Sequence, residues 1–364
     1  DTIIMNSVIQ YFPSVDYLVD VIKQGVKLVK PGGAMFLGDL RNFELLESFR
    51  TSTEIFRSSP TETIDHLKHR IYQRILHENE LLISPKLFLA LQQELPQISH
   101  VEIIARPGND DNELTRYRYE AVLHIQGEAP KAADSINWID WQEQAFDLKK
   151  LRAELTNLEG DFLGLSNIPN ALIQDDTLAV KILASENKHK NLNDLKQDVE
   201  SQLKPWATLN QLYQIANELD MVFEPSWLGC TDQGEMRGVY KRQSVATVKV
   251  VHPVEFEPEK SGYQIYANNP LIEQVYRELV PDIRNYAYDK MPEYMVPAAY
   301  VLMSSLPLTA NGKVDRKALP APDLNVNCDA EYVAPQTVTQ DLLASIWSEL
   351  LAIDKIGIRD NFFE

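Results

Sequence analysis

One lysine, Lys313, stands in a turn-forming run near the end of the chain, which reads PLTANGKVDRKALP from Pro307 to Pro320. The preceding Asn311 and Gly312 favour a left-handed turn that projects the next side chain from the tip of a loop. A lysine held in this way supplies a compact positive charge to oxygens that become negative in a transition state. Taken alone, such a turn more often marks a solvated hairpin, so the assignment of Lys313 as catalytic depends on the rest of the sequence.

Amide and phenol side chains follow the first apolar run of the chain. Residues 1–5 are mostly apolar, and Asn6, Ser7, Gln10 and Tyr11 come directly after them. Amides and phenols orient an amine by hydrogen bonds without offering a competing nucleophile. Asn6 and Tyr11 are therefore candidate catalytic residues, and Gln10 is a candidate substrate-binding residue. A plain strand end that caps the next helix is the structural alternative for this motif.

Charged residues follow a second apolar run. Asp39 and Arg41 come just after it, and the residues from Glu113 to Arg118 read as the beginning of a later strand. Because side chains alternate between the two faces of a strand, Arg116 and Arg118 should share one face. We expect Asp39, Arg41, Glu113 and Arg116 to bind substrate. A surface ion pair and a salt-bridged sheet face are the alternatives.

These polar groups must be positioned by a sheet and its helices. Residues 1–5 read as a strand, residues 17–29 show a helical period, and residues 34–38 read as a strand again. This order predicts a parallel sheet, and ligands of such sheets bind at the carboxyl ends of strands, where Asn6 and Asp39 stand. The rest of the chain predicts helices over 44–91, 271–291 and 338–351, strands over 101–105 and 116–125, and helical stretches with polar turns over 138–219.

The composition excludes several classes of protein. The chain has 364 residues, 44% of them hydrophobic, which is enough for two or three buried cores. Its net charge of −18 disfavours a protein that binds nucleic-acid backbones. Cys230 and Cys328 lack the spacing of a zinc site or a disulfide framework, and no apolar run is long enough to span a membrane. We expect a cytoplasmic protein with no nucleic-acid or membrane partner and no metal ligands of its own.

The motif NSVIQYFP, which starts at Asn6, resembles the strand-end motif of the N-methyltransferase domains embedded in nonribosomal peptide synthetases. The resemblance continues through PGG at 31–33, GDLR at 38–41, ELLISP at 80–85 and NELTRYRY at 112–119. It implies a domain that uses S-adenosylmethionine, with Asn6 and Tyr11 serving methyl transfer. It also implies that Arg41 contacts the thioester or pantetheine arm and that Glu113 and Arg116 line the acceptor pocket.

Adenylation-like sequence follows this part of the chain. It includes YANNPL at 266–271, MPEYMVP at 291–297 and the Lys313 loop. The resemblance implies that Lys313, carried by Asn311 and Gly312, stabilises the formation of an aminoacyl adenylate from an amino acid and ATP with Mg²⁺. The final residues GIRDNFFE, at 357–364, resemble the lead-in to the carrier-domain serine that bears 4′-phosphopantetheine.

Together these resemblances cover essentially the whole chain and predict an α/β and α+β multidomain fold. The expected parts are a partial doubly wound methyltransferase sheet over 1–262, a small α+β adenylation subdomain over 263–322, a linker over 323–331 and the start of a helical carrier bundle over 332–364. Residues from about 134 to 260 carry no motif that resembles a known one. We expect the S-adenosylmethionine loop and the large adenylation subdomain upstream of Asp1, and the carrier serine beyond Glu364. The chain is then inactive alone and works with those segments and with the condensation domain of the same synthetase.

Two other classes of function stay open. A stand-alone acyl-adenylate-forming ligase would share the Lys313 loop, but it would need neither the motif at Asn6 nor the carrier-like tail. A non-catalytic scaffold with a degenerate methyltransferase fold would not need the Lys313 loop.

Overall fold

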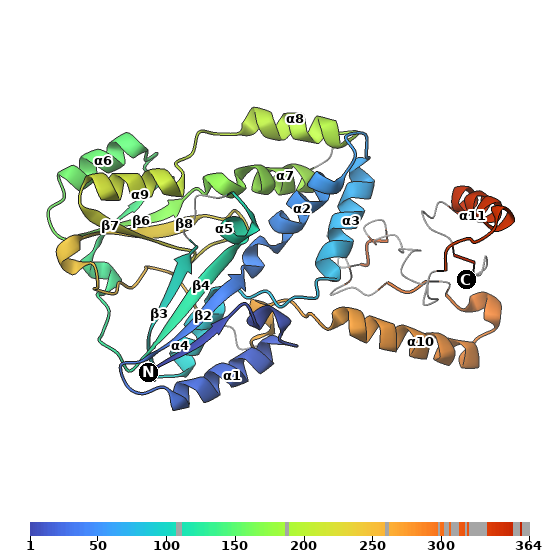
Figure 1. Ribbon diagram of the computed structural model, residues 1–364, viewed down its shortest axis with the longest axis horizontal. Helices are drawn as coiled ribbons and strands as arrows, with labels where there is room; N and C mark the ends of the chain where they lie inside the picture. Colours follow the sequence, from blue (N-terminus) through green and yellow to red (C-terminus); the bar gives the residue numbers. More distant parts are fainter. Residues whose placement is uncertain are drawn as a thin grey trace. The chain divides into compact units, whose positions relative to one another are not determined.

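A computed structural model describes residues 1–106, 111–185, 189–258, 262–297, 299–301, 306, 313–316, 319, 333–351 and 357–358. The chain divides into two compact units, Asp1–Ile272 and Glu273–Glu364. In its described part, the first unit holds two four-stranded mixed sheets with helices packed against them (Figure 1). The fold is therefore mixed α/β, as expected. The expected domain boundary at 262 lies ten residues before the end of this unit, and the domain assignment stays a prediction.

The first sheet contains the parallel strand pair that the sequence predicts. Its strand order is β1-β2-β4-β3, where the strands are β1 Thr2–Asn6, β2 Ala34–Arg41, β3 Ile98–Ala105 and β4 Arg118–Ile125. β1 and β2 are parallel, with Asn6 opposite Gly38, whereas β4 is antiparallel to both of its neighbours. β1, β2 and β3 therefore all run in one direction, and their carboxyl ends lie at the same edge of the sheet.

Amphipathic helices follow β1 and β2 along the chain, and their apolar spacing was visible in the sequence. The helix predicted over 17–29 is α1 Val15–Leu28, which begins where the Ser14 hydroxyl accepts a hydrogen bond from the Tyr17 amide (3.2 Å). Its Leu18 and Ile22 side chains are buried. The helical region predicted over 44–91 consists of α2 Leu46–Arg57, α3 Ile64–Leu76 and α4 Lys86–Glu94.

Two details of the first sheet differ from the prediction. β2 does not end at Gly38, because a bulge at Asp39, whose φ is +65°, lets pairing resume at Leu40 and continue to Arg41. The stretch from Glu113 to Tyr117 is a short helix, α5, instead of a strand. Asn112 forms a capping box with Thr115 at the start of α5, which explains why a helix begins at this point.

The second sheet was not predicted. Its order is β5-β6-β8-β7, with β5 Asn137–Asp140, β6 Phe162–Ile168, β7 Met221–Ser226 and β8 Met236–Arg242. The helices of this part are α6 Leu148–Thr156, α7 Gln174–Ala184, α8 Leu192–Gln202 and α9 Leu209–Glu218. Its strands are short, and they contain Gly164, Pro225 and Gly238, residues that normally weaken a strand pattern.

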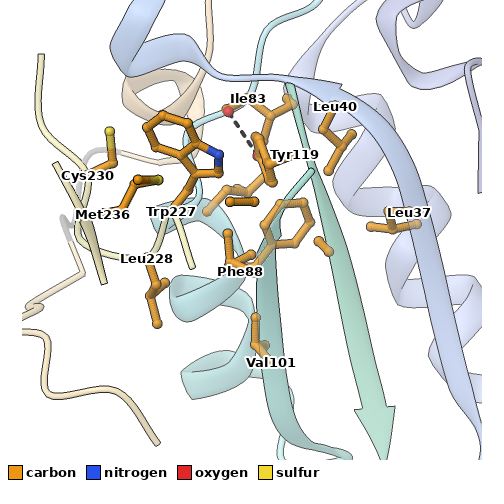
Figure 2. Close-up of a cluster of buried hydrophobic side chains, with 14 of the residues drawn as sticks. Leu37, Leu40, Ile83, Phe88, Val101, Tyr119, Trp227, Leu228, Cys230 and Met236 are labelled. Atoms are coloured by element: carbon orange, nitrogen blue, oxygen red, sulfur yellow. Dashed lines mark hydrogen bonds between the residues drawn. The ribbon is translucent and has the colours of Figure 1, made fainter. Parts of the chain in front are cut away.

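Side chains from both sheets share one buried cluster (Figure 2). Trp227 and Met236 come from the second sheet and its loop, and Phe88 and Val101 come from the first sheet and its covering helix. Within this cluster the Tyr119 hydroxyl donates to the Ile83 carbonyl oxygen (2.9 Å), which satisfies a buried polar group. The two sheets therefore belong to one folded body.

The second unit supplies two helices that the sequence predicted. They are α10 Ile272–Lys290, which begins one residue before the unit, and α11 Val338–Leu351. None of the described helices is long and apolar enough to cross a lipid bilayer.

Candidate functional site

The first part of the candidate site is a hydrogen-bonded chain at the carboxyl ends of β1 and β2. Asn6 Nδ2 donates to Ser7 Oγ (3.2 Å), and Ser7 Oγ donates to Asp39 Oδ2 (2.8 Å). Gly38 lies beside this chain, and a Cβ at that position would lie 2.1 Å from Asn6 Oδ1. A side chain at this position would therefore displace the Asn6 amide from its place at the end of β1.

Asp39 is the centre of this site. Besides the hydrogen bond from Ser7, its carboxylate forms ion pairs with two arginines. Arg106 Nη1 lies 3.2 Å from Oδ1, and Arg118 Nη1 lies 2.9 Å from Oδ2. Arg106 directly follows β3, and Arg118 begins β4. The bulge in β2 turns the Asp39 side chain toward both arginines, so three strands of one sheet edge converge on a single carboxylate.

Arg41 lies two residues further along β2 in a buried ion network. It is 5% exposed, its Nη1 lies 3.3 Å from Glu78 Oε1 and 2.9 Å from Glu80 Oε2, and its guanidinium stacks on Phe49 at 4.7 Å. Glu78 is also buried, and it receives a second cation from Arg50. The charge of Arg41 is balanced by carboxylates of this chain, so its position is that of a buried cross-link.

α5 separates the two residues expected to line an acceptor pocket. Glu113 Oε1 accepts from Arg118 Nη2 (2.7 Å) and lies 3.9 Å from Arg41 Nε, which places it in the Asp39 site. Arg116 instead binds Asp111 (Nε to Oδ1, 2.5 Å) and Asp176 (Nη1 to Oδ2, 2.8 Å). Its hydrogen bond to Asp111 is the main reason that the Arg116 pKa is raised. Glu113 therefore joins the site, and the Arg116 guanidinium is bound outside it.

Gln10 and Tyr11 lie in a short 3₁₀ turn, Ile9–Tyr11, directly after β1. Gln10 is buried, and its Oε1 has no hydrogen-bond partner among the residues that the structure describes. Leaving a buried acceptor unpaired costs about 1–3 kcal/mol, so a donor from a bound molecule would stabilise this position. Tyr11 is 72% exposed, and its hydroxyl is accessible to a molecule from solvent.

Lys313 lies in the second unit, where it is exposed. Asn311 and Gly312, predicted to shape its loop, lie outside the described residues. Lys313 is accordingly described within its own unit and is not part of the Asp39 site. Within the described part of the chain, no group of three histidine, cysteine or acidic residues is arranged to hold a metal ion.

The structure adds Ser7, Arg106, Arg118 and Glu78 to the predicted residues of the site. A signal for Arg106 was present, because it follows a predicted strand whose carboxyl end lies at the same edge as those of β1 and β2. No sequence signal links Glu78 to Arg41, because this contact depends on how the chain after α3 returns to the sheet.

The chain is homologous over its whole length to segments of nonribosomal peptide synthetases. It is 37% identical to chondramide synthase cmdD of Chondromyces crocatus and 29% identical to cyclosporin synthetase simA of Tolypocladium inflatum, in both cases over 100% of the chain. A nonribosomal peptide synthetase of Emericella nidulans, asqK, is also 29% identical over the whole chain. The chain spans only 9%, 2% and 14% of these three proteins, respectively. No protein-family model matches the chain.

Proposed function

We propose that the chain is a segment of a nonribosomal peptide synthetase module that activates an amino acid, loads it on a carrier and N-methylates it. The observation that carries this proposal is the homology of the whole chain to such synthetases. The Asp39 site supports the methylation step, because it lies at the carboxyl ends of parallel strands, where α/β sheets bind ligands. Residues 1–262 are then methyltransferase, 263–322 adenylation subdomain, 323–331 linker and 332–364 carrier.

The residues at the end of β1 fit an amine acceptor. The buried Gln10 Oε1 needs a hydrogen-bond donor, and an amino group supplies one. Asn6 precedes Gln10 in the sequence, Tyr11 follows it, and both are exposed. Their side chains would orient the amine so that the nitrogen lone pair faces the methyl group. S-adenosylmethionine supplies the activated methyl group. The contribution of this chain is to bind and orient the neutral amine by accepting a hydrogen bond from it, and the proton that the methylated nitrogen then loses passes to water.

The charged groups around Asp39 have a supporting role in this proposal. Asp39 is compensated by Arg106 and Arg118, and Arg41 is compensated by Glu78 and Glu80. Because Asp39 and Arg41 are both paired with opposite charges, they hold the strand ends in place. Neither of them then places an unpaired charge beside the amine. We therefore assign amine binding to Asn6, Gln10 and Tyr11, and assign positioning to Asp39 and Arg41.

Adenylation is the second proposed activity. Lys313 would supply its positive charge to the phosphoryl oxygens of ATP, which acts with Mg²⁺, as the carboxylate of the amino acid attacks. Lys313 is exposed in the second unit. The product would be transferred to 4′-phosphopantetheine on the carrier domain, in a synthetase that also contains a condensation domain.

The methylation assignment is tested in a complete synthetase module that contains this chain. Asn6→Ala and Tyr11→Phe should each slow N-methylation, measured by transfer of a labelled methyl group to the carrier-bound amino acid. Aminoacyl-adenylate formation, measured by amino-acid-dependent pyrophosphate exchange, should stay close to wild type. Equal loss of both activities, or unchanged methylation, would contradict the assignment.

A further inference from the structure

The two sheets of the first unit have the same topology. In each sheet the first two strands are parallel, the fourth strand pairs antiparallel with the second, and the third strand is at the edge. One helix joins the first strand to the second, and three α-helices join the second strand to the third. Residues 137–242 therefore repeat the strand order of residues 2–125 and the helices between the first three strands, whereas α5, between β3 and β4, has no counterpart in the described residues between β7 and β8.

The repeat extends to irregular details of the backbone. Each second strand bulges against the fourth strand, over Leu37–Leu40 in β2 and over Leu165–Ile168 in β6. The bulge contains a non-glycine residue with positive φ in both cases, Asp39 at +65° and Asn167 at +50°. Such residues are uncommon, so their occurrence at equivalent positions is specific evidence of equivalence.

The spacing of equivalent residues is constant after the bulge. Asn42 and Asn170 each follow the positive-φ residue by three residues, and each caps a 3₁₀ turn by accepting from an amide two residues ahead (3.1 Å and 3.0 Å). Thr63 caps α3 and Asn191 caps α8, each by accepting from an amide three residues ahead. Asn42 and Asn170 are 128 positions apart, and so are Thr63 and Asn191. Asp39 and Asn167 are separated by the same 128 positions.

The two halves meet through equivalent elements. β3 contacts β7, and α2 contacts α7. Thr63 and Asn191, the equivalent caps, form an isolated antiparallel bridge with each other. Contacts between the same element of both partners are the mark of a two-fold interface, so the halves are related by a pseudo-two-fold axis near this bridge.

The second half lacks the charges of the candidate site. Asn167 stands where the first half has Asp39, and Pro169 stands where it has Arg41. Asn167 Nδ2 donates to Asp140 Oδ2 (2.5 Å), and this hydrogen bond connects the ends of β5 and β6. The two charged residues Asp39 and Arg41 therefore have uncharged counterparts in the second half.

The second half nevertheless contacts α5, the helix that carries Glu113 of the candidate site. Asp176, in the first turn of α7, accepts a hydrogen bond from Arg116 Nη1 (2.8 Å) and one from the Tyr117 hydroxyl. Asp176 is 6% exposed, and burial raises its pKa. Tyr117 ends α5, and its carbonyl oxygen accepts from the Asn42 amide (2.9 Å) at the end of β2. Asp176 thereby fixes the helix that carries Glu113 and leads into Arg118.

We propose that residues 137–242 are a second copy of the fold of residues 2–125, which packs against the first copy as the second subunit of a dimer would. Asp176 of this second copy is then a positioning residue for the methylation site. It acts through α5, because Glu113 and Arg118 bind each other and Arg118 binds Asp39. This inference rests on the proposed methyltransferase function.

The test uses a complete synthetase module that contains this chain. Asp176→Asn keeps the size of the side chain but removes the charge that Arg116 and Tyr117 face. It should lower kcat for N-methylation by about 10- to 100-fold, the effect of a small displacement of an orienting group, with KM for the methyl donor unchanged. Tyr117→Phe should have a similar effect. The double variant should be no worse than the more impaired single variant, because both changes break one connection.

Asp175→Asn is the matched control, because Asp175 is half-exposed and lies 3.5 Å from the same arginine. It should leave kcat within about twofold of wild type, an energy well below that of a buried charged pair. Pyrophosphate exchange should be unchanged in all variants, which separates loss of positioning from loss of folding. The N-methylation rate of Asp39→Asn tests whether the Asp39 site itself is needed for methyl transfer.

Three results would overturn the inference. One is a normal kcat in both Asp176→Asn and Tyr117→Phe while Asp39→Asn is impaired, which would leave the proposed function intact. Another is a fully additive double variant. A normal rate in Asp39→Asn as well would overturn the proposed role of the site and this inference with it.

Discussion

Replacement of Arg41 by methionine should strongly destabilise the first unit. The guanidinium is 5% exposed and lies within 3.3 Å of two carboxylates, Glu78 and Glu80. Methionine keeps the apolar contact with Phe49 but leaves the buried Glu78 with Arg50 as its one remaining ion-pair partner among the described residues. Removing one partner of a buried ion pair costs about 3–5 kcal/mol, and because Arg50 remains, we expect about 3 kcal/mol.

Urea unfolding followed by tryptophan fluorescence measures this cost. Four of the five tryptophans, Trp138, Trp141, Trp206 and Trp227, lie in the first unit, so the signal reports mainly on it. Arg57→Met is the matched control, because Arg57 is exposed and lies 3.5 Å from Glu54. Glu54 itself is buried but keeps Arg70 at 2.7 Å, so losing the exposed Arg57 should cost about 0–1 kcal/mol and the control should unfold nearly as wild type does.

A double variant distinguishes a buried pair from two independent residues. Glu78→Gln combined with Arg41→Met should cost less than the two single variants together, with a coupling energy of about 1–3 kcal/mol. The reasoning is refuted if Arg41→Met is as stable as the Arg57→Met control while N-methylation is lost. Arg41 would then act through substrate, as the sequence first indicated, and not through Glu78.

Two further predictions concern the Lys313 loop and pH. Lys313→Ala in a complete module should slow pyrophosphate release by about 10²- to 10³-fold, and Lys313→Arg should restore little of it; a normal rate would contradict the adenylation role. Burial lowers the pKa of His100 to about 4 and that of His252 to about 3, from 6.5. Because the unfolded chain takes up these protons first, the free energy of unfolding should fall as pH falls from about 6.5 to 4, and urea midpoints at pH 7.5 and 5 test this. His100→Gln should make the decrease smaller.

The sequence predicted those parts of the fold that depend on local periodicity. α1, α10 and α11 were predicted because their apolar residues recur at helical spacing, and β1 and β2 because each is a short apolar run between turn signals. The parallel pairing of β1 and β2 followed from the helix between them. These features need no information from distant parts of the chain.

The features that were missed depend on contacts between distant residues. The bulge at Asp39 exists because β4 pairs with β2 on both sides of it, and β4 begins almost eighty residues later in the sequence. α5 is five residues long and is stabilised by its capping box and by Asp176, so no helical period was available to reveal it. The strands of the second sheet are interrupted by glycine and proline, and only their pairing identifies them.

The same distinction separates the residues of the candidate site by role. Asp39, Arg41, Glu113 and Arg116 were all expected to bind substrate because charged residues at strand ends often do. In the structure each of them is bound by opposite charges of the chain itself. Binding a charged ligand would require breaking these pairs, and each buried charge left behind would then be unpaired. Gln10 has a buried acceptor with no partner in the described part of the chain, so it gains a hydrogen bond without losing one. An uncharged hydrogen-bond donor such as an amine is therefore a better ligand for this edge of the sheet than an anion or a cation.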